Sequence, residues 1–404
     1  MPEAGPEDHD KDLTLPPDET GLRRAVEALR SGGIVAYPTE TQYGLGVDAL
    51  NPASTRSLHE LKERGEGTFL VVTADEAAAR ELCSDFPDPA RSIARNCWPG
   101  PVTILVPARD GLPAEVVGEG GLLGVRVSGN PIARELPARL GGPVVSTSAN
   151  LTGRAPLNDP GLINRVFPDR LDLILDGGVL PPGPGSTIVD GRTVPLKVIR
   201  EGAVSRNSLA RRTRLEVEGG QALPLILTVC TGNTCRSPMA EGALKVMLRQ
   251  RGLEDEFDVQ SAGVAAVNWG MATEETQAAA WEQGIDLSTH KPRQLSQQMT
   301  QEADIILVMS ERHRNRVAVI DPHVRDRIHI IRKLSAELHG KSVAGRREIR
   351  DPYGSPPAAY RKVLKMIWND LEKGFEGTLQ RARDHRASLG ESYPGADYSE
   401  EVRS

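Results

Sequence analysis

Apolar runs alternate with amphipathic stretches in the second half of the chain. Three of these runs are short and rich in β-branched residues, a more polar stretch at 258–262 stands among them, and stretches with helical periodicity separate them. We predict parallel strands at Leu225–Val229, Asp258–Ala262, Ile305–Met309 and Ile328–Ile331. Strands that alternate with helices predict a doubly wound sheet of the Rossmann-like kind, in which ligands bind at the carboxyl ends of the strands.

The first half begins with a different pattern. We predict that Thr20 caps a helix that runs through Ser31 and ends at the following glycine pair. The run GIVAYPTETQYGLGVDA then predicts a buried strand, which breaks at Pro38 into a polar turn that contains glycine. This turn has no Walker spacing of lysine and serine or threonine, so it is not a P-loop.

Composition shifts indicate where domains begin and end. The first residues are rich in proline and acidic side chains, residues 203–222 carry arginines without helical periodicity, and the C-terminal residues are charged and aperiodic. We predict a disordered N-terminus at 1–18, a first domain at 19–202, a linker at 203–222, a second domain at 223–380 and a disordered tail at 381–404.

The composition is that of a soluble globular protein. The 404 residues are 39% hydrophobic and 26% charged, and no apolar run approaches the length that spans a membrane. The N-terminus has neither the basic region nor the apolar core of a signal peptide, so we expect a cytoplasmic protein without a membrane partner. Four cysteines are too few for a disulfide framework. A net charge of −6 argues against wholesale nucleic-acid binding, although it leaves room for a local basic patch.

Residues 225–239, LILTVCTGNTCRSPM, carry the clearest chemistry. The strand ends at Cys230, and we expect Ser237 to cap the next helix and Pro238 to open it. The loop N–H groups and the helix N-terminus then surround a space that suits phosphate. Arg236 can bind phosphate oxygens as a bidentate fork, and the positive field favours the nucleophilic thiolate of Cys230.

The run CTGNTCRSP resembles the signature loop of the low-molecular-weight protein phosphatases, and the resemblance extends from about Leu225 to Asp370. It implies that Cys230 attacks phosphorus, that Arg236 binds phosphate and that Asp351, in an Asp-Pro dipeptide, protonates the leaving group. The remaining loop residues implied to surround the phosphate are Thr231, Gly232, Asn233, Thr234, Cys235 and Ser237. An inert buried cysteine and a simple Asp-Pro turn are the alternatives.

The substrate implied by this resemblance is a phosphoprotein. Thr234 stands where tyrosine-directed relatives commonly have an aliphatic residue, and the loop with its SAGV run looks like the protein-arginine phosphatase subgroup. Tyr353 favours phosphotyrosine instead, because an aromatic residue after Asp-Pro can flank that substrate. We favour phosphoarginine and keep phosphotyrosine open. Arsenate reduction would need a cysteine after Cys235, and the sequence has none.

Small hydroxyl side chains and scattered cations lie at predicted strand ends of the first domain, and this combination suits a polyanionic substrate. The segments that carry them, among them Trp98-Pro99-Gly100 and the STSAN run at 146–150, resemble the YrdC-like L-threonylcarbamoyladenylate synthases over about Leu22 to Gly202. This resemblance implies a twisted mixed α/β domain. It also implies that threonine, bicarbonate and ATP give threonylcarbamoyl-AMP and pyrophosphate, the first step toward threonylcarbamoyl modification of adenosine 37 in tRNA.

The same resemblance implies site residues and partners. Threonine would be held by Thr39, Arg126, Ser146 and Ser186. ATP, with Mg²⁺, would be held by Lys62, Arg64, Ser148, Asn150 and Arg200. We assign no metal-ligating side chain. The implied partners are tRNA-modification enzymes that take up the product.

Two hypotheses remain for the chain as a whole. In the first, both domains are enzymes, and catalysis in the first domain rests on positioning and charge neutralisation. In the second, the first domain is a nucleotide- or RNA-binding module that regulates the phosphatase. For Lys62 and Arg64 the alternative is a solvated helix end. For residues 146–150 it is a polar exit from a strand.

Overall fold

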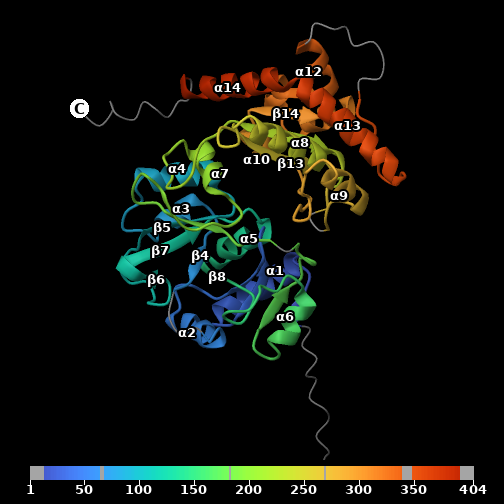
Figure 1. Ribbon diagram of the computed structural model, residues 1–404. Helices are drawn as coiled ribbons and strands as arrows, with labels where there is room; N and C mark the ends of the chain where they lie inside the picture. Colours follow the sequence, from blue (N-terminus) through green and yellow to red (C-terminus); the bar gives the residue numbers. More distant parts are fainter. Residues whose placement is uncertain (1–12, 64–67, 182, 268–269, 339–347, 392–404) are drawn as a thin grey trace, which may run out of the picture. The chain divides into compact units, whose positions relative to one another are not determined.

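A computed structural model describes residues 13–63, 68–181, 183–267, 270–338 and 348–391. The chain divides into two compact units, residues 1–222 and 223–404, and each is considered by itself. Figure 1 labels the helices and strands of both units. Arg64 lies outside the described residues, as do residues 1–12 and 392–404 of the two segments predicted to be disordered.

The first unit is built on a mixed, twisted sheet. Its strands are β1 (Thr14–Leu15), β2 (Val35–Pro38), β3 (Tyr43–Gly46), β4 (Leu70–Val72), β5 (Val102–Pro107), β6 (Val117–Gly118), β7 (Leu122–Arg126), β8 (Val144–Ser148), β9 (Leu173–Leu175), β10 (Thr187–Asp190) and β11 (Lys197–Arg200). Their order is β1-β9-β2-β3-β8-β4-β7-β5-β10-β11, and β6 pairs with β7. Parallel pairs such as β4 with β7 stand beside antiparallel pairs such as β5 with β7, which confirms the predicted mixed α/β class.

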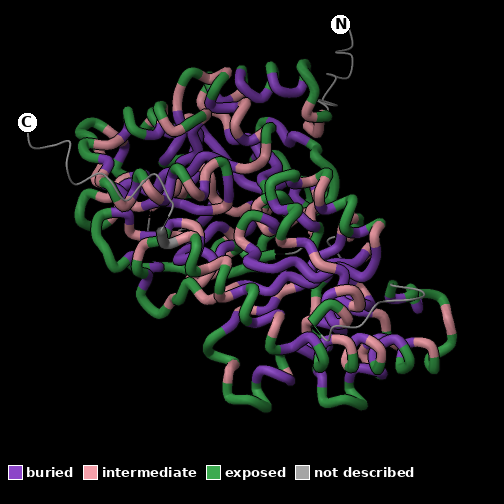
Figure 2. The backbone as a smooth tube through the Cα atoms, turned by 90° about the horizontal axis from the view of Figure 1, so that it is seen from above, coloured by how far each residue is buried: buried purple, intermediate pink, exposed green. Residues whose placement is uncertain are grey.

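Helices cover this sheet and connect its strands. They are α1 (Glu19–Arg30), α2 (Pro52–Leu61), α3 (Glu76–Arg80), α4 (Asp88–Cys97), α5 (Pro131–Leu140), α6 (Pro160–Val166) and α7 (Arg206–Thr213), with a 3₁₀ turn, η1 (Glu119–Gly121). The apolar stripe of α1 packs with α5 against β2 and β9. In Figure 2 the outer helices alternate between buried and exposed positions along the chain, as amphipathic helices do.

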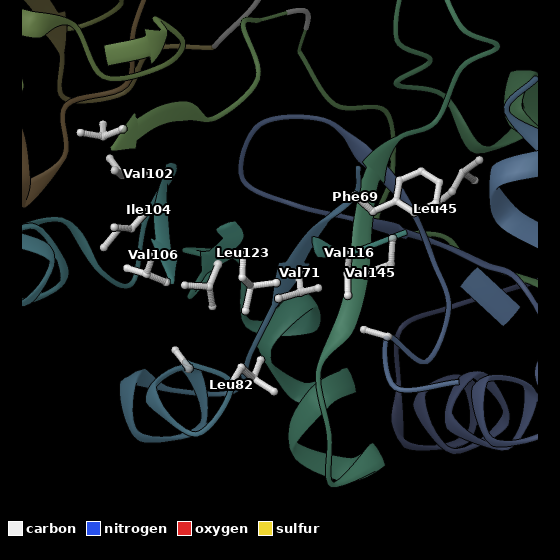
Figure 3. Close-up of a cluster of buried hydrophobic side chains, with 14 of the residues drawn as sticks. Leu45, Phe69, Val71, Leu82, Val102, Ile104, Val106, Val116, Leu123 and Val145 are labelled. Carbon is white, nitrogen blue, oxygen red and sulfur yellow. The ribbon is translucent and has the colours of Figure 1, made fainter. Parts of the chain in front are cut away.

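Alternation along β5 separates a core from a pocket. Val102, Ile104 and Val106 point into the apolar core, where Figure 3 shows Val106 at the end of a row that continues through Leu123 of β7 and Val71 of β4. The residues between them face the other way, because successive side chains of a strand lie on opposite faces. Two of those residues, Thr103 and Leu105, line a pocket. The period of two therefore places polar groups on one face of the sheet without opening the core.

Two predictions about the ends of the first unit are wrong. Asp18 caps α1 in place of Thr20, since its carboxylate accepts the Gly21 N–H, and β1 pairs with β9 just before it within the segment predicted to be disordered. The predicted linker at 203–222 contains α7, and the Leu209 side chain of that helix is fully buried in the core. The arginines make this segment polar overall, so the short apolar stripe by which the helix packs was not recognised in the sequence.

The second unit is a four-stranded parallel sheet with helices on both faces. Its strands are β12 (Leu225–Cys230), β13 (Asp258–Gly263), β14 (Ile305–Val308) and β15 (Ile328–Ile330), in the order β13-β12-β14-β15. All three pairings are parallel, as predicted from the alternating pattern. Every residue of β12 is buried, which fits a central strand covered on both faces.

Each face of this sheet has its own apolar core. One is completed by α8 (Arg236–Gln250), α9 (Glu274–Trp281), α12 (Ile331–Leu338), α13 (Pro357–Lys373) and α14 (Phe375–Glu391). The other is completed by α10 (Gln297–Glu302), α11 (Glu311–Ile320) and the 3₁₀ segment η2 (Pro322–Arg327). The sheet order changes direction between β12 and β14, so the end of β12 is the switch point at which ligands bind.

The chain stays helical beyond residue 380, where we predicted disorder. Leu379 and Ala382 of α14 are fully buried, and the carboxylate of Asp304 binds both His385 and Arg386. The charged sequence of this segment is therefore the outer face of a packed helix as far as residue 391. No helix among the described residues is long and apolar enough to cross a membrane.

Candidate functional sites

A pocket of about 870 Å³ lies on the polar face of the first sheet. It brings together eight of the nine residues predicted for this site, Thr39, Lys62, Arg126, Ser146, Ser148, Asn150, Ser186 and Arg200. They come from five strands or strand ends and from the C-terminus of α2. The volume is that of an ordinary small-molecule site, and its cations and hydroxyl groups suit an anionic ligand.

A carboxylate that the sequence analysis missed holds Arg126 in this pocket. Glu40 accepts from Arg126 Nη2 at 2.7 Å, from the Ser128 hydroxyl and from the Gly129 N–H at 2.8 Å. Burial by itself raises the pKa of Glu40, but Arg126 and these hydrogen bonds outweigh it, and the net pKa lies below its usual range. Glu40 follows Thr39 in the PTET turn, and its negative charge was the sequence signal that it could pair with a cation.

Lys62 is not the solvated helix end of the alternative hypothesis. Its side chain is buried, and Nζ donates to Ser148 O at 2.6 Å, to Asn150 O at 2.5 Å and to Asn150 Oδ1 at 2.9 Å. Ser148 Oγ donates to the same amide oxygen at 2.6 Å. The lysine therefore fixes the turn after β8, so residues 146–150 are more than a polar strand exit.

A second guanidinium lines the same pocket. Arg200 Nη2 donates to the Ser186 carbonyl oxygen at 2.9 Å, and Ser186 Oγ lies 3.0 Å from Thr103 Oγ1. Burial lowers the pKa of Arg200, and the nearby Arg126 cation lowers it further. Two cations that line one pocket favour a ligand with negative charge.

In the second unit, the loop after β12 surrounds the Cys230 thiol with donors. Cys230 is buried, and its Sγ lies 3.0 Å from Ser237 Oγ and 3.3 Å from the Asn233 N–H. The prediction that Ser237 caps α8 is wrong, because the helix begins at Arg236 and Cys235 holds the cap position. The Ser237 hydroxyl is free of the capping role and contacts the sulfur.

Asn233 supports the shape of this loop. It has a left-handed backbone with φ of +56°, which asparagine tolerates better than most residues. Its Nδ2 donates to Ser237 Oγ at 2.9 Å and to Ser261 Oγ at 2.8 Å, and its Oδ1 accepts from the Arg293 N–H at 2.9 Å. His290 Nε2 donates to the Asn233 carbonyl oxygen at 2.8 Å. Hydrogen bonds from separate segments of the chain thus fix this loop in a shape that can bind an anion.

The two other residues predicted to act with Cys230 are in direct contact. Arg236 Nη2 donates to Asp351 Oδ2, and Nη1 donates to the Ile349 carbonyl oxygen at 3.3 Å. The Arg236 Nε is buried and has no hydrogen-bond partner in the part of the chain that the structure describes. The Asp351 side chain is 49% exposed, so it can reach a group that enters from solvent.

Comparison with known proteins assigns the two units of the chain to two different families. Residues 27–202 match the Sua5/YciO/YrdC family model, described as "Telomere recombination". The threonylcarbamoyl-AMP synthase of Methylococcus capsulatus is 43% identical over 157 residues, which are 39% of this chain and 84% of that protein. The chain belongs to the threonylcarbamoyl-AMP synthase family. The first unit is its synthase-family domain.

The second unit is a low-molecular-weight phosphatase domain. Residues 225–385 match the family model described as "Low molecular weight phosphotyrosine protein phosphatase". The crystal structure of the tyrosine phosphatase AmsI of Erwinia amylovora is 32% identical and covers 38% of this chain and 93% of its own, with a TM-score of 0.33. A structure of the arginine phosphatase YwlE is 30% identical and covers 40% and 99%, with a TM-score of 0.35.

The synthase-family domain offers no ready-made metal cage. Among the residues that the structure describes, no group of three or more His, Cys, Asp or Glu side chains could hold a metal ion. Mg²⁺ commonly keeps several waters and binds through substrate phosphates and one or two carboxylates. The pocket therefore fits Mg²⁺ that arrives with a nucleotide, and its cations would meet the remaining phosphate charge.

Sequence reasoning missed the residues that support these sites. In the phosphatase domain they are His290 and Arg293, which lie 57 and 60 positions from the asparagine that they hold. Both are common polar residues without a local motif. Ser261, which also binds this asparagine, lies in the SAGV run that the sequence did single out.

Proposed function

We propose that the chain is a bifunctional enzyme. Its first domain makes L-threonylcarbamoyl-AMP and pyrophosphate from threonine, bicarbonate and MgATP, for the tRNA-modification enzymes that act at adenosine 37. Its second domain hydrolyses phosphoryl groups on protein side chains through Cys230. One observation carries the proposal. Each domain matches a known family, and within each domain the cations and hydroxyl groups gather at one site.

The synthase pocket supports a reaction without a side-chain nucleophile. Arg126 and Ser186 would receive the threonine, together with Thr39 and Ser146, while Arg200 would face nucleotide phosphates. Ser148 and Asn150 would meet the nucleotide on the turn that Lys62 fixes. Holding three reactants in one pocket removes much of the entropic barrier, and the Arg200 guanidinium would offset the charge that develops on leaving pyrophosphate.

The phosphatase site supports a two-step transfer. The Cys230 sulfur would form a bond to phosphorus while the bond from phosphorus to the leaving group breaks, and Asp351 would give its proton to the leaving atom. Water would then attack phosphorus and return a proton to Asp351, so that the thiolate and inorganic phosphate are released. Arg236 would hold the phosphoryl oxygens through Nη2 and through its Nε, which has no hydrogen-bond partner among the described residues.

We propose phosphoarginine as the preferred substrate of the phosphatase domain, with phosphotyrosine as the competing one. The Thr234 hydroxyl lies in the loop 3.6 Å from Cys235 Sγ and is partly exposed, so a polar leaving group could reach it. Tyr353 supports the competing substrate, since its ring is 71% exposed two residues after Asp351. Hydrolysis of matched phosphoarginine and phosphotyrosine peptides by the native chain decides between them.

A reciprocal experiment tests the bifunctional proposal. Pyrophosphate release from ATP is measured with and without threonine and bicarbonate, and p-nitrophenyl phosphate hydrolysis is measured on the same samples. We expect Arg126→Ala to abolish only the first activity and Cys230→Ser to abolish only the second. Absence of threonine-dependent release would leave the first domain as a nucleotide- or RNA-binding module.

A further inference from the structure

A buried histidine outside the signature loop contacts that loop next to its arginine. His313 of α11 is only 3% exposed. Its Nε2 lies 2.9 Å from Thr231 Oγ1, and its Nδ1 lies 2.9 Å from Ser310 Oγ. Arg236 Nη2 lies 3.5 Å from the same Thr231 oxygen. A continuous chain of polar contacts thus runs from the start of α11 to the guanidinium.

The direction of this chain depends on which ring nitrogen carries the proton. Burial and then the Arg236 cation lower the pKa of His313 to about 4, so one ring nitrogen donates and the other accepts at neutral pH. Ser310 caps α11, and its oxygen accepts the His313 backbone N–H at 3.4 Å, so its hydroxyl proton can turn toward Nδ1. We assign the ring proton to Nε2, the tautomer in which Nδ1 accepts from Ser310 and Nε2 donates to Thr231.

This direction changes what Thr231 can offer. Its oxygen accepts from His313 and from Arg236, so its hydroxyl proton remains for a third group. Arg236 has a buried Nε without a partner among the described residues, and its Nη2 is shared between Asp351 and Thr231. An incoming phosphoryl group would therefore find the hydroxyl and the guanidinium donors side by side.

We propose that His313 is a positioning residue of the phosphatase site and acts through Thr231. It fixes the Thr231 hydroxyl beside Arg236, so that both side chains present donors to the same phosphoryl group. This inference rests on the proposed phosphatase function. It gives helix α11 a role in phosphate binding, although this helix lies outside the signature loop.

Two pairs of variants separate this role from simple packing. In His313→Gln the side-chain amide reaches about as far as Nε2 and can still donate to Thr231, whereas the shorter His313→Asn can replace only the bond to Ser310. Thr231→Val removes the hydroxyl at nearly constant shape, and Thr231→Ser keeps it. A histidine that only fills space would not act through the Thr231 hydroxyl, so its variants would not reproduce the loss of phosphate binding expected for Thr231→Val.

The measurements use the full chain with p-nitrophenyl phosphate as substrate and inorganic phosphate as inhibitor. We expect His313→Asn and Thr231→Val each to lower kcat/KM and to weaken phosphate inhibition by about tenfold, the size of one lost hydrogen bond to a charged site. His313→Gln and Thr231→Ser should stay within about threefold of the native chain. The double variant His313→Asn/Thr231→Val should be no worse than either single variant, because both remove one interaction. His329→Asn on β15 is the matched control and should change neither constant.

Three results would overturn the inference. They are equal losses in the Gln and Asn variants, additive losses in the double variant, and phosphate inhibition unchanged in Thr231→Val. If His313→Asn fails to fold, the Thr231 pair still decides, because Val and Ser fit the same space. A native chain without Cys230-dependent hydrolysis would instead refute the proposed phosphatase function, and the inference with it.

Discussion

Arg236 and Asp351 are 115 positions apart in the chain, yet the guanidinium donates directly to the carboxylate. The arginine side chain is 7% exposed, whereas the aspartate is 49% exposed. An ion pair with one partner in solvent contributes little, about 1 kcal/mol or less. A phosphoryl dianion that binds the arginine through two hydrogen bonds is a stronger partner, so it can displace the carboxylate and leave it beside the leaving group.

Asp351→Asn should therefore affect the reaction according to its leaving group. Asparagine cannot give up a proton, so we expect kcat for phenyl phosphate, a poor leaving group, to fall by about 10²-fold or more. The activated p-nitrophenyl ester needs less protonation and should lose much less. Equal losses with the two esters would mean that Asp351 acts on Arg236 rather than on the leaving group.

Ser237→Ala should make Cys230 less reactive. The Ser237 hydroxyl lies 3.0 Å from the sulfur and 3.3 Å from the Ala262 carbonyl oxygen, and its single proton can turn from that carbonyl to the thiolate. Without it we expect the rate of alkylation by iodoacetamide at neutral pH to fall several-fold, since one hydrogen bond to a charged group contributes about 1.5–3 kcal/mol. Ser335→Ala, a buried serine on α12, is the control and should alkylate at the native rate. An unchanged rate in Ser237→Ala would show that the loop N–H groups suffice.

His313 should make the phosphatase domain less stable in acid. Burial and Arg236 lower its pKa to about 4 in the folded chain, against about 6.5 in an unfolded one. Between these values the unfolded chain binds more protons, so stability rises with pH through this window and is lost as pH falls to 4. Between pH 7 and pH 4.5 the loss amounts to about 2–3 kcal/mol. Urea unfolding at pH 4.5 and pH 7 should show a smaller difference for His313→Gln than for the native chain.

That pH difference should shrink without vanishing. Burial also lowers the pKa of His290 and of His329, which act in the same direction. A His313→Gln chain with the full native difference would mean that the ring is not buried as a neutral group in solution.

The sequence predicted the local parts of both sites and missed their long-range supports. Periodicity predicts the four parallel strands. Cys230 and Arg236 come to one site because they stand only a few residues apart, at the two ends of the loop that follows β12. Glu40 and His313 depend on partners 82 to 89 positions away, and a single charged or titratable residue has no periodic signal. Helix α7 was missed for a related reason, since tertiary burial of Leu209 outweighs a polar local composition.

Glu40→Gln should separate the two substrates of the synthase pocket. The neutral amide leaves the Arg126 cation buried without its counter-charge, which costs about 2–4 kcal/mol of stability in a partly buried pair. It also frees the guanidinium from the position set by Glu40, Ser128 and Gly129. We expect the KM for threonine in threonine-dependent pyrophosphate release to rise about tenfold or more, while the KM for ATP changes little. Glu60→Gln on the exposed face of α2 is the matched control and should leave both constants unchanged. An equal rise in both KM values would mean that Glu40 supports the pocket as a whole, and a rise confined to ATP would place Arg126 on the nucleotide.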